Sequence, residues 1–492
     1  MKKRPLWMKA FSLAIGLTAT GVLMTACTKG YDDDPGFESS VRNSTLKALA
    51  ADDIVVKSSA DGSTFTFTWQ VVHGAGGYEV KLFNVSDPDN AVLVKADTTD
   101  ACTVTMPRED DVNYMVAVRA LSNASLGNTE QAEATEKTFT TFTPTYGTIS
   151  YDEYPDLKAY FDANPLPEGP TEMLCFDLEG GKEYTLSGDI DFGGHHVTIR
   201  CTNKNSHAGL KPAAGAKFVT FGSFYLKYLD VDCAETNKPI VELSETPDDS
   251  IKNLVGTSGY YFIQDPIVFQ SCNIKNLGAC LIQDQGKYVV RNMTINDCVI
   301  AIDRTAEATN AVAGDPIIKL TKASYVTDFV VKNSTIYSKE HTSSAFLTYN
   351  GRPKELNDAS ELQKISFVST TLFNLSYSTN FRGDTRTQGQ TSNYFTVEKC
   401  IIVDCGKKNF INSLIRQLST NPTVSYYKNT YWWDGANVKE SQVCDGGDRS
   451  GTALDTDPDF KDPANGDFTP QGADQINNAT GDPRWLKAEV IY

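Results

Sequence analysis

Six short stretches in the second half of the chain share one arrangement of apolar and polar positions. Each opens on an apolar residue, closes on another five positions later, and carries a small or soft residue two positions before the close. The closing residues follow one another at steps of 21, 41, 36, 30 and 30 residues. A short strand that recurs at such steps predicts a solenoid of stacked coils. The stretches are FQSCNI (269–274), VRNMTI (290–295), VKNSTI (331–336), FVSTTL (367–372), VEKCII (397–402) and YKNTYW (427–432).

The same ladder extends toward the N-terminus. Val231 is an earlier member, and the 43 residues between it and Ile274 predict about two coils. Coils with apolar or small residues pointing inward are typical of a right-handed parallel β-helix, which we predict over residues 171–492 together with a C-terminal closing segment. Several cysteines fall at inward positions and are predicted to be small core residues rather than a disulfide framework: Cys233, Cys272, Cys298 and Cys400.

Residues 45–143 follow a different pattern, in which apolar and polar residues alternate. Runs of period two, separated by clusters of Gly, Asn and Asp, predict an antiparallel sandwich, so that the whole chain is all-β. Trp69 on an early strand, Tyr78 at the start of the next, and Tyr114 opening a Tyr-x-Val-x-Val strand resemble a fibronectin type III domain. The resemblance implies that Trp69 and Tyr114 are core residues.

Two further segments are predicted to close the β-helix. Residues 144–170 are interpreted as a linker and N-terminal cap, in which 151–165 form a short amphipathic helix with Leu157, Tyr160 and Phe161 on one side. The segment DTDPDFKDPANGDFTPQ (455–471) resembles a terminal segment of bacterial β-helix proteins. That resemblance implies that Phe460 and Phe468 tuck into the last coil.

The N-terminus is predicted to be a targeting segment rather than a folded element. Lys2, Lys3 and Arg4 precede a short apolar region, and LMTAC (23–27) resembles a bacterial lipobox. Residues 1–26 are thus predicted to be a lipoprotein signal peptide, with Cys27 carrying the lipid and residues 27–44 forming a tether. The run Asp32–Asp34 resembles the acidic signal that exports Bacteroidetes lipoproteins to the cell surface, although a plain acidic tether remains the alternative.

The predicted architecture resembles a group of Bacteroidetes lipoproteins that join a fibronectin-like domain to a pectin-lyase-like β-helix. Such proteins are associated with polysaccharide utilisation loci. The resemblance implies a polysaccharide ligand, a lipid anchor in the outer membrane, and outer-membrane glycan-uptake proteins as partners. The net charge is −17, and it becomes −21 without the four basic residues of the signal peptide. Nucleic acid is therefore excluded as a partner.

Two kinds of chemistry compete for the β-helix surface. A lyase that cleaves a uronate polymer by β-elimination needs a base and a cation such as Ca²⁺ or Arg, and the candidates are Lys339, Arg382 and Arg386. The insertion FRGDTRTQGQ (381–390) is where we expect the groove wall, although solvated loop charges are the alternative. No motif matches the catalytic signature of a lyase family, and paired carboxylates for a glycosidase are not found at matching positions of the stretches.

Aromatic residues favour binding without catalysis. Tyr337, Phe373 and Trp433 follow the closing positions and are predicted to point outward along one face, where flat rings stack against sugars. Arg382 would complete this glycan site, unless the closing segment covers the face. No cofactor or metal site is predicted, because Asp455, Asp457 and Asp459 lack the glutamate of a calcium loop, and the side chains of His195 and His196 diverge. The sequence thus predicts binding of an extended polysaccharide, a pectic or other plant or host glycan, for a glycan-utilisation system. A lyase that cleaves a uronate polymer is the alternative.

Overall fold

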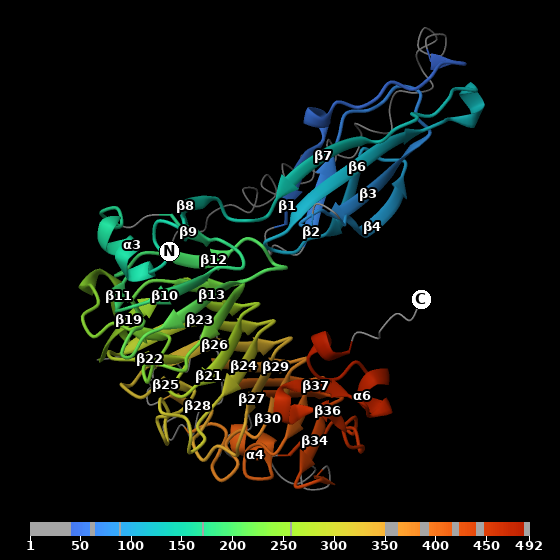
Figure 1. Cartoon of the computed structure of the whole chain (residues 1–492). Coiled ribbons are helices and arrows are strands. Elements are labelled where there is room, and N and C mark those ends of the chain that lie inside the picture. The colour runs from blue at the N-terminus through green and yellow to red at the C-terminus, as the bar shows by residue number, and fades with distance from the viewer. Residues whose placement is uncertain are drawn as a thin grey trace, which may run out of the picture. The chain divides into compact units, whose positions relative to one another are not determined.

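The computed structural model describes residues 41–59, 64–87, 90–169, 172–255, 258–349, 363–383, 393–415, 423–438 and 447–486. Its contacts divide the chain into two compact units, Met1–Pro144 and Thr145–Tyr492. Strands dominate both units (Figure 1), and the predicted all-β class is confirmed. Among the described residues, no helix is both long enough and apolar enough to cross a membrane.

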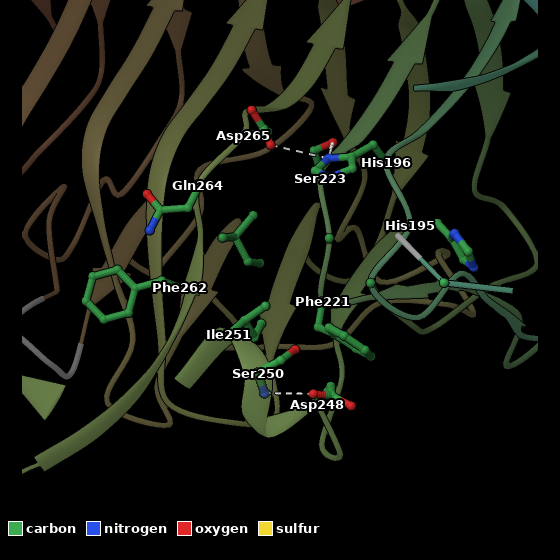
Figure 2. A pocket seen from close by; sticks show the side chains of 14 residues that line it. His195, His196, Phe221, Ser223, Asp248, Ser250, Ile251, Phe262, Gln264 and Asp265 are labelled. Atoms are coloured by element: carbon green, nitrogen blue, oxygen red, sulfur yellow. Dashed lines mark hydrogen bonds and ion pairs between the residues drawn. The ribbon is translucent and has the colours of Figure 1, made fainter. Parts of the chain in front are cut away.

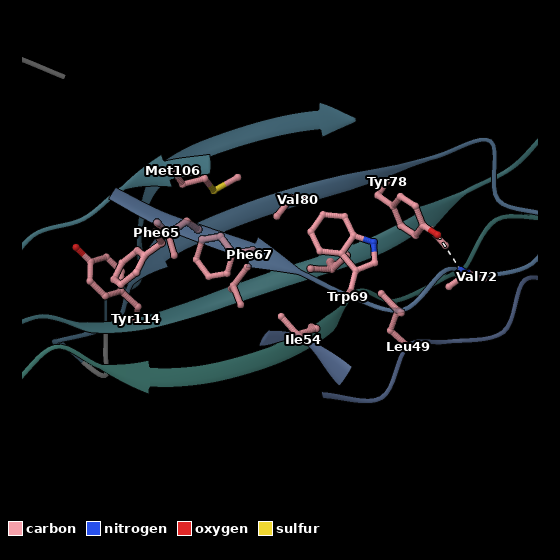
Figure 3. Close-up of a cluster of buried hydrophobic side chains, with 14 of the residues drawn as sticks. Leu49, Ile54, Phe65, Phe67, Trp69, Val72, Tyr78, Val80, Met106 and Tyr114 are labelled. Carbon is pink, nitrogen blue, oxygen red and sulfur yellow. Dashed lines mark hydrogen bonds between the residues drawn. The ribbon is translucent and has the colours of Figure 1, made fainter. Parts of the chain in front are cut away.

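The first unit packs two antiparallel sheets around one core. The sheet orders are β1-β2-β5 and β4-β3-β6-β7, and side chains of both sheets meet in the cluster of Figure 3. Trp69 and Tyr114 are buried there, as expected. The Tyr78 hydroxyl accepts the amide of Val72 at 2.8 Å. The elements are η2 (Ala51–Asp53), β1 (Val55–Ser58), β2 (Thr64–Thr68), β3 (Gly77–Asn84), β4 (Val92–Thr99), β5 (Thr103–Pro107), β6 (Asn113–Leu121), η3 (Ala124–Leu126) and β7 (Thr135–Thr140).

The second unit contains three sheets in which neighbouring strands pair almost entirely in parallel. The chain visits them in a fixed cycle, for example β10, β11 and β12, followed by β13, β14 and β15. We call the twelve-stranded sheet the long sheet. Its strands are β8 (Thr145–Ile149), β9 (Leu174–Leu178), β12 (Val197–Cys201), β15 (Phe224–Lys227), β18 (Lys252–Val255), β19 (Ser258–Ile263), β20 (Ile267–Gln270), β23 (Tyr288–Asn296), β26 (Tyr325–Lys332), β29 (Gln363–Val368), β31 (Asn393–Glu398) and β33 (Thr423–Tyr427).

The other two sheets are called the middle sheet and the short sheet. The middle sheet contains β10 (Glu183–Leu186), β13 (Ala208–Pro212), β16 (Leu229–Asp232), β21 (Asn273–Leu277), β24 (Val299–Ile302), β27 (Thr335–Ser338), β30 (Thr371–Phe373), β32 (Ile401–Val403), β34 (Thr430–Trp433) and β35 (Ala436–Asn437). The short sheet contains β11 (Ile190–Asp191), β14 (Phe218–Thr220), β17 (Val241–Leu243), β22 (Ile282–Asp284), β25 (Ile318–Leu320) and β28 (Leu347–Tyr349).

The strand register corrects two of the six stretches. Ile274 pairs with Ile300 rather than with Ile295, which instead pairs with Phe269 on the long sheet. Strand β23 is nine residues long and alternates inward apolar residues. The repeated pattern therefore also matches the end of β23, although the true member of the ladder is the next strand, β24. In the last stretch Tyr426, and not Tyr427, pairs with Val397, so the predicted stretch begins one residue too late. The register in the middle sheet runs Val231, Ile274, Ile300, Ile336, Leu372, Ile402, Tyr431.

The corner between the long and middle sheets explains the third position of four of the six stretches, and in the two stretches with a corrected register the corner residue is Asp297 or Lys428. Residues there have a left-handed backbone, with φ between 48° and 54°: Ser271, Asp297, Asn333, Ser369, Lys399 and Lys428. The next residue of each coil points inward and is fully buried: Cys272, Cys298, Ser334, Thr370, Cys400 and Asn429. The inward placement predicted for the cysteines is confirmed, and burial raises the pKa of the Cys400 thiol to about 12.

The N-terminal end of the second unit is closed by helix α3 (Leu157–Ala163), inside the segment where a helix is predicted. The Asp156 carboxylate accepts the amide of Ala159, which caps the helix. Phe161 packs against Phe176 and Phe192, with ring centroids 4.9 and 5.2 Å apart. The interpretation of 144–170 as linker and cap misses one element, because β8 pairs in parallel with β9.

The C-terminal part packs on the outer side of the middle sheet. A two-stranded hairpin leads into two short helical elements that contact earlier coils. Helix α4 takes the place that a short-sheet strand has in earlier coils, since Arg382 bridges to Leu347 and its amide bonds to Ser413. The elements are η4 (Asp249–Ile251), α4 (Phe410–Ile415), β36 (Phe460–Asp462), η6 (Pro463–Asn465), β37 (Asp467–Pro470), α6 (Ala473–Asn477) and η7 (Pro483–Trp485).

Candidate functional site

A cavity of about 440 Å³ lies where three neighbouring strands of the long sheet begin. One wall is formed by the residues just before β12 and β15, which include His195, His196, Phe221 and Ser223 (Figure 2). The register that pairs Val197 with Phe224 sets these two turns side by side. The cavity volume falls within the range of small-molecule sites.

Close approach of the two turns requires a glycine. A Cβ atom at Gly222 would lie 2.3 Å from the carbonyl oxygen of His195. The Gly222 amide donates to the Thr220 hydroxyl at 2.9 Å. The sequence GGHH before β12 and FGS before β15 therefore form a tightly packed pair of turns, and this pairing fixes His196 beside Ser223.

The opposite wall is an insertion that the sequence reasoning misassigned. Val231 pairs directly with Ile274, so the long step between them contains one coil and an insertion, not two coils. The insertion folds as η4 and the antiparallel hairpin β18-β19. Its residues lining the cavity are Asp248, Ser250, Ile251, Phe262, Ile263, Gln264 and Asp265. The excess length of this step over its neighbours was the available signal for a wall.

The polar groups of the cavity are held by short contacts. His196 Nδ1 lies 2.8 Å from Ser223 Oγ and 3.4 Å from Asp265 Oδ2. A hydrolytic triad needs both ring nitrogens, one toward the nucleophile and one toward the carboxylate, whereas here one nitrogen serves both partners. Ser223 is also fully buried. The arrangement thus orients an imidazole at the cavity wall and does not build a nucleophile.

Two further titratable groups in this cavity have shifted pKa values. Burial lowers the pKa of His195, and the neighbouring His196 lowers it further. Hydrogen bonds from Ser250 lower the pKa of Asp248, whose Oδ1 accepts the Ser250 amide at 2.7 Å. At neutral pH the cavity therefore contains an ionised Asp248 and a neutral His195.

A second cavity of about 400 Å³ lies on the other side of His195. Its lining is mostly apolar and includes Phe161, Leu166, Ile190 and Phe192. His195 lines both cavities. His195 and His196 are predicted not to form a metal site because their side chains diverge, and Figure 2 shows the two rings pointing in different directions. Among the described residues, no cluster of three or more His, Cys, Asp or Glu side chains could hold a metal ion.

The predicted aromatic face is largely covered by the chain's own C-terminal segment. Phe468 is fully buried, and its ring centroid lies 4.8 Å from that of Tyr337 and 5.4 Å from that of Phe373. Phe460 also contacts Phe373, at 6.2 Å. The expectation that Phe460 and Phe468 tuck into the last coil is wrong, because these rings pack against Tyr337 and Phe373 of earlier coils.

Trp433 does not share the row of Tyr337 and Phe373. The register places Trp432 in that row instead, because the predicted last stretch begins one residue too late. The Trp433 ring stacks on Tyr377 at 4.3 Å, and Tyr377 stacks on His341 at 3.8 Å. The Tyr377 hydroxyl donates to Asp434 at 2.9 Å. Ring faces that could bind sugar are therefore partly used within this stack.

Arg382 is buried rather than exposed in a groove wall. Its side chain is fully inaccessible, and Nε and Nη2 donate to the carbonyl oxygens of Leu414 and Ile415 at 2.6 and 2.7 Å. These carbonyls end helix α4, where unpaired acceptors and the negative end of the helix dipole favour a cation. Arg382 is thus a structural residue, and its placement excludes direct contact with a ligand.

The other predicted residues are not grouped into a site. Lys339 is exposed and forms an ion pair with Asp303. Arg386 and Cys27 lie outside the described residues. At the predicted closing turn, Asp457 Oδ1 accepts the amide of Asp459 at 2.9 Å, a local turn contact.

Comparisons with known proteins concern domains rather than activity. Three family models match the chain in tandem, each describing a domain of unknown function: DUF4992 over residues 1–183, DUF4957 over 182–339 and DUF5123 over 365–485. Among solved structures, the solution structure of the fn3 domain of the human collagen alpha-1(XX) chain is 22% identical, with a TM-score of 0.16. That match covers 20% of this chain and 88% of the collagen domain. No curated protein matches the chain.

Proposed function

We propose that the chain is a lipid-anchored protein of the bacterial cell surface that binds polysaccharide through its second unit. In this proposal Cys27 carries the lipid, a fibronectin type III-like domain serves as spacer, and the second unit is a right-handed parallel β-helix. The fixed cycle through three parallel sheets supports the β-helix assignment. The sheet orders of three and four antiparallel strands support the fibronectin-like assignment.

The observation that carries the proposed binding function is the cavity between the β12 and β15 turns and the β18-β19 insertion. Phe221 and Phe262 lie in opposite walls. The Arg291 guanidinium lies over the Phe262 ring at 5.1 Å, so Phe221 is the ring that would stack against the C–H face of a sugar. His196, Gln264 and Asp248 supply donors and acceptors for sugar hydroxyls. A mostly apolar cavity with a few convergent polar groups is the usual form of a small-molecule site.

A polysaccharide lyase is less well supported. Elimination needs a base beside a cation that stabilises the enolate. Of the three proposed residues, Arg382 is buried against helix α4 and Lys339 is paired with Asp303. Incubation with uronate polymers, with and without Ca²⁺, decides between binding and lyase activity, since a lyase generates unsaturated products that absorb in the ultraviolet. Catalytic product formation would overturn the assignment as a binding protein.

The binding proposal is tested by affinity electrophoresis and calorimetry of the full chain against plant and host glycans. Phe221→Ala and Gln264→Ala are each expected to weaken binding by about tenfold or more. The matched control is Tyr394→Ala, which removes an aromatic ring that is 39% exposed outside the cavity. Binding that survives both cavity variants but fails in Tyr394→Ala would place the glycan on the long sheet and sink the cavity proposal.

Membrane attachment and partners form a separate part of the proposal. Cys27→Ala is expected to move the protein from the membrane fraction to the soluble fraction, because the lipid is the proposed anchor. Association with outer-membrane glycan-uptake proteins is expected to persist only for the lipidated form. Retention of Cys27→Ala in the membrane fraction would contradict the proposed anchor.

A further inference from the structure

The two cavities beside β12 share one side chain. His195 lines the cavity of about 440 Å³ and the cavity of about 400 Å³. Gly193 of the same turn lines the second cavity, and Gly194 lines the first. One short turn therefore separates two spaces, each of a size that accommodates a small ligand. A ligand long enough to pass this turn would contact both spaces.

The charges around both cavities are predominantly negative. Three carboxylates line them: Asp248 and Asp265 in the first cavity and Asp191 in the second. Around these two cavities, the described lining residues include no lysine or arginine. His196 lies 3.4 Å from Asp265, so this imidazole already faces a carboxylate. A uronate would be repelled here, in a chain whose net charge is −17.

The surroundings of His195 favour an uncharged ligand. Burial lowers the pKa of His195, which keeps the imidazole neutral at neutral pH. A neutral imidazole adds no positive charge that would attract the carboxylate of an acidic sugar. The second cavity is lined by Phe161, Leu166 and Phe192. The rings of Phe161 and Phe192 are buried, so the apolar surface that a further sugar would contact comes from Leu166 and Pro165.

We propose that the site takes a neutral oligosaccharide, with one sugar in each cavity and His195 between them. This proposal rests on the glycan-binding function above and narrows it to an uncharged chain of at least two sugars. An acidic polysaccharide would bring its carboxylates next to Asp191, Asp248 and Asp265, and this repulsion disfavours it as the ligand.

The experiment titrates the full chain with two series of oligosaccharides in a calorimeter. One series contains neutral β-linked gluco-, xylo- and galacto-oligosaccharides from one to four sugars, and the other contains oligogalacturonides of the same lengths. We expect affinity to rise by about tenfold or more from one sugar to two in a neutral series, because the second cavity adds contacts. The oligogalacturonides are expected not to bind, with or without Ca²⁺.

Variants test the contribution of the second cavity separately from that of the first. Leu166→Trp should fill the second cavity and lower the affinity for the longer neutral sugars to that of the monosaccharide. His195→Ala serves as a second probe of the same step, with a thermal melt to confirm folding. Ile476→Trp places the same bulk on an exposed site of helix α6 and is expected to change nothing; Ile476 is 49% exposed.

The outcomes distinguish this inference from the function on which it rests. If Phe221→Ala weakens binding but neither Leu166→Trp nor His195→Ala alters its dependence on length, the two-cavity inference fails and the binding function stands. Tighter binding of oligogalacturonides than of every neutral series would overturn the neutral class. If no oligosaccharide binds, or Phe221→Ala binds as the wild type does, the proposed glycan site itself fails.

Discussion

Aromatic side chains gather in two regions of the second unit, and the two regions are used differently. Beside the early strands β12 and β15, Phe221 and Phe262 line an open cavity. On the middle sheet, Tyr337 and Phe373 lie against Phe468 of the chain's own C-terminal segment. An outward aromatic row is thus no sufficient sign of a ligand site, because a later segment with apolar residues can cover it.

The covering segment is held by a row of hydroxyl groups on the middle sheet. The Thr335 hydroxyl donates to Asp482 Oδ2 at 2.8 Å, and the Thr371 hydroxyl accepts the Asp482 amide at 3.1 Å. Gln475 donates to the Thr430 hydroxyl at 3.1 Å. These contacts, repeated along neighbouring coils, explain why the segment follows the sheet instead of leaving its aromatic face open to solvent.

The largest expected effect comes from removing the covering ring. Phe468→Ala should lower the free energy of unfolding by about 3–5 kcal/mol, because it leaves a cavity between Tyr337, Phe373 and Trp485. Chemical denaturation measures the loss. Glycan affinity should be unchanged, since the proposed site lies elsewhere. Phe460→Ala is the matched control, with a smaller loss because this ring is only half buried. A loss below about 1 kcal/mol for Phe468→Ala would show that the cover is not packed as described.

The next effect concerns the buried carboxyl of the same segment. Burial raises the pKa of Asp482 from 3.8 to about 6, and the charge of Asp297 raises it as well. Arg484, whose Nε lies 3.0 Å from Asp482 Oδ2, lowers the pKa and offsets part of this rise. The native state therefore binds this proton more tightly than the unfolded chain does. The resulting stabilisation is fully present below pH 3.8 and is lost as the pH rises through about 6.

Asp482→Asn tests this dependence, because the amide side chain does not titrate between pH 4 and pH 7. The difference in unfolding free energy between wild type and variant should shift by up to about 3 kcal/mol between pH 7 and pH 4, in favour of the wild type at the lower pH. Urea denaturation at both pH values measures it, and comparing the two proteins removes the contribution of other carboxyl groups. A difference that does not change with pH would contradict the shifted pKa.

A smaller effect is expected at Arg382, which the sequence placed in a glycan site. Arg382→Lys keeps the charge but cannot pair with the carbonyls of Leu414 and Ile415 as the guanidinium does. The free energy of unfolding should fall by about 1–3 kcal/mol, measured by denaturation, with glycan affinity unchanged. The control is Lys339→Met, which breaks the ion pair between an exposed lysine and the buried Asp303 with a loss of about 1 kcal/mol. Lost glycan binding with unchanged stability would restore Arg382 to a ligand site.

Local patterns predicted the elements but not their partners. The alternation around Trp69 and the repeated inward cysteines follow from burial along a strand, so each could be inferred from a few residues. The frame of the stretches was ambiguous because β23 carries inward apolar residues at Val290, Met293 and Ile295. Only pairing with the neighbouring coil decides among them.

The site depends on contacts between segments far apart in the sequence. Phe221 and Phe262 lie in opposite walls because an insertion within one coil folds back as a hairpin, and no local pattern specifies where a hairpin docks. The covering of Tyr337 by Phe468 likewise joins residues more than a hundred positions apart. Arg382 was misplaced for the same reason, since helix α4 supplies its partners.

The smallest expected effect is at Trp433, whose ring is not fully exposed and does not belong to the row that Phe468 covers. Its ring stacks on Tyr377 with an interplanar angle of 11°, and it is only half buried. Trp433→Ala should cost about 1 kcal/mol, the contribution of an aromatic pair near the surface, measured by urea denaturation beside Tyr394→Ala as control. If the stack serves only to join neighbouring coils, the affinity for oligosaccharides stays that of the wild type. An affinity reduced tenfold or more would instead make this stack a second glycan site, because a remote packing change of this size does not reach the cavity beside His195.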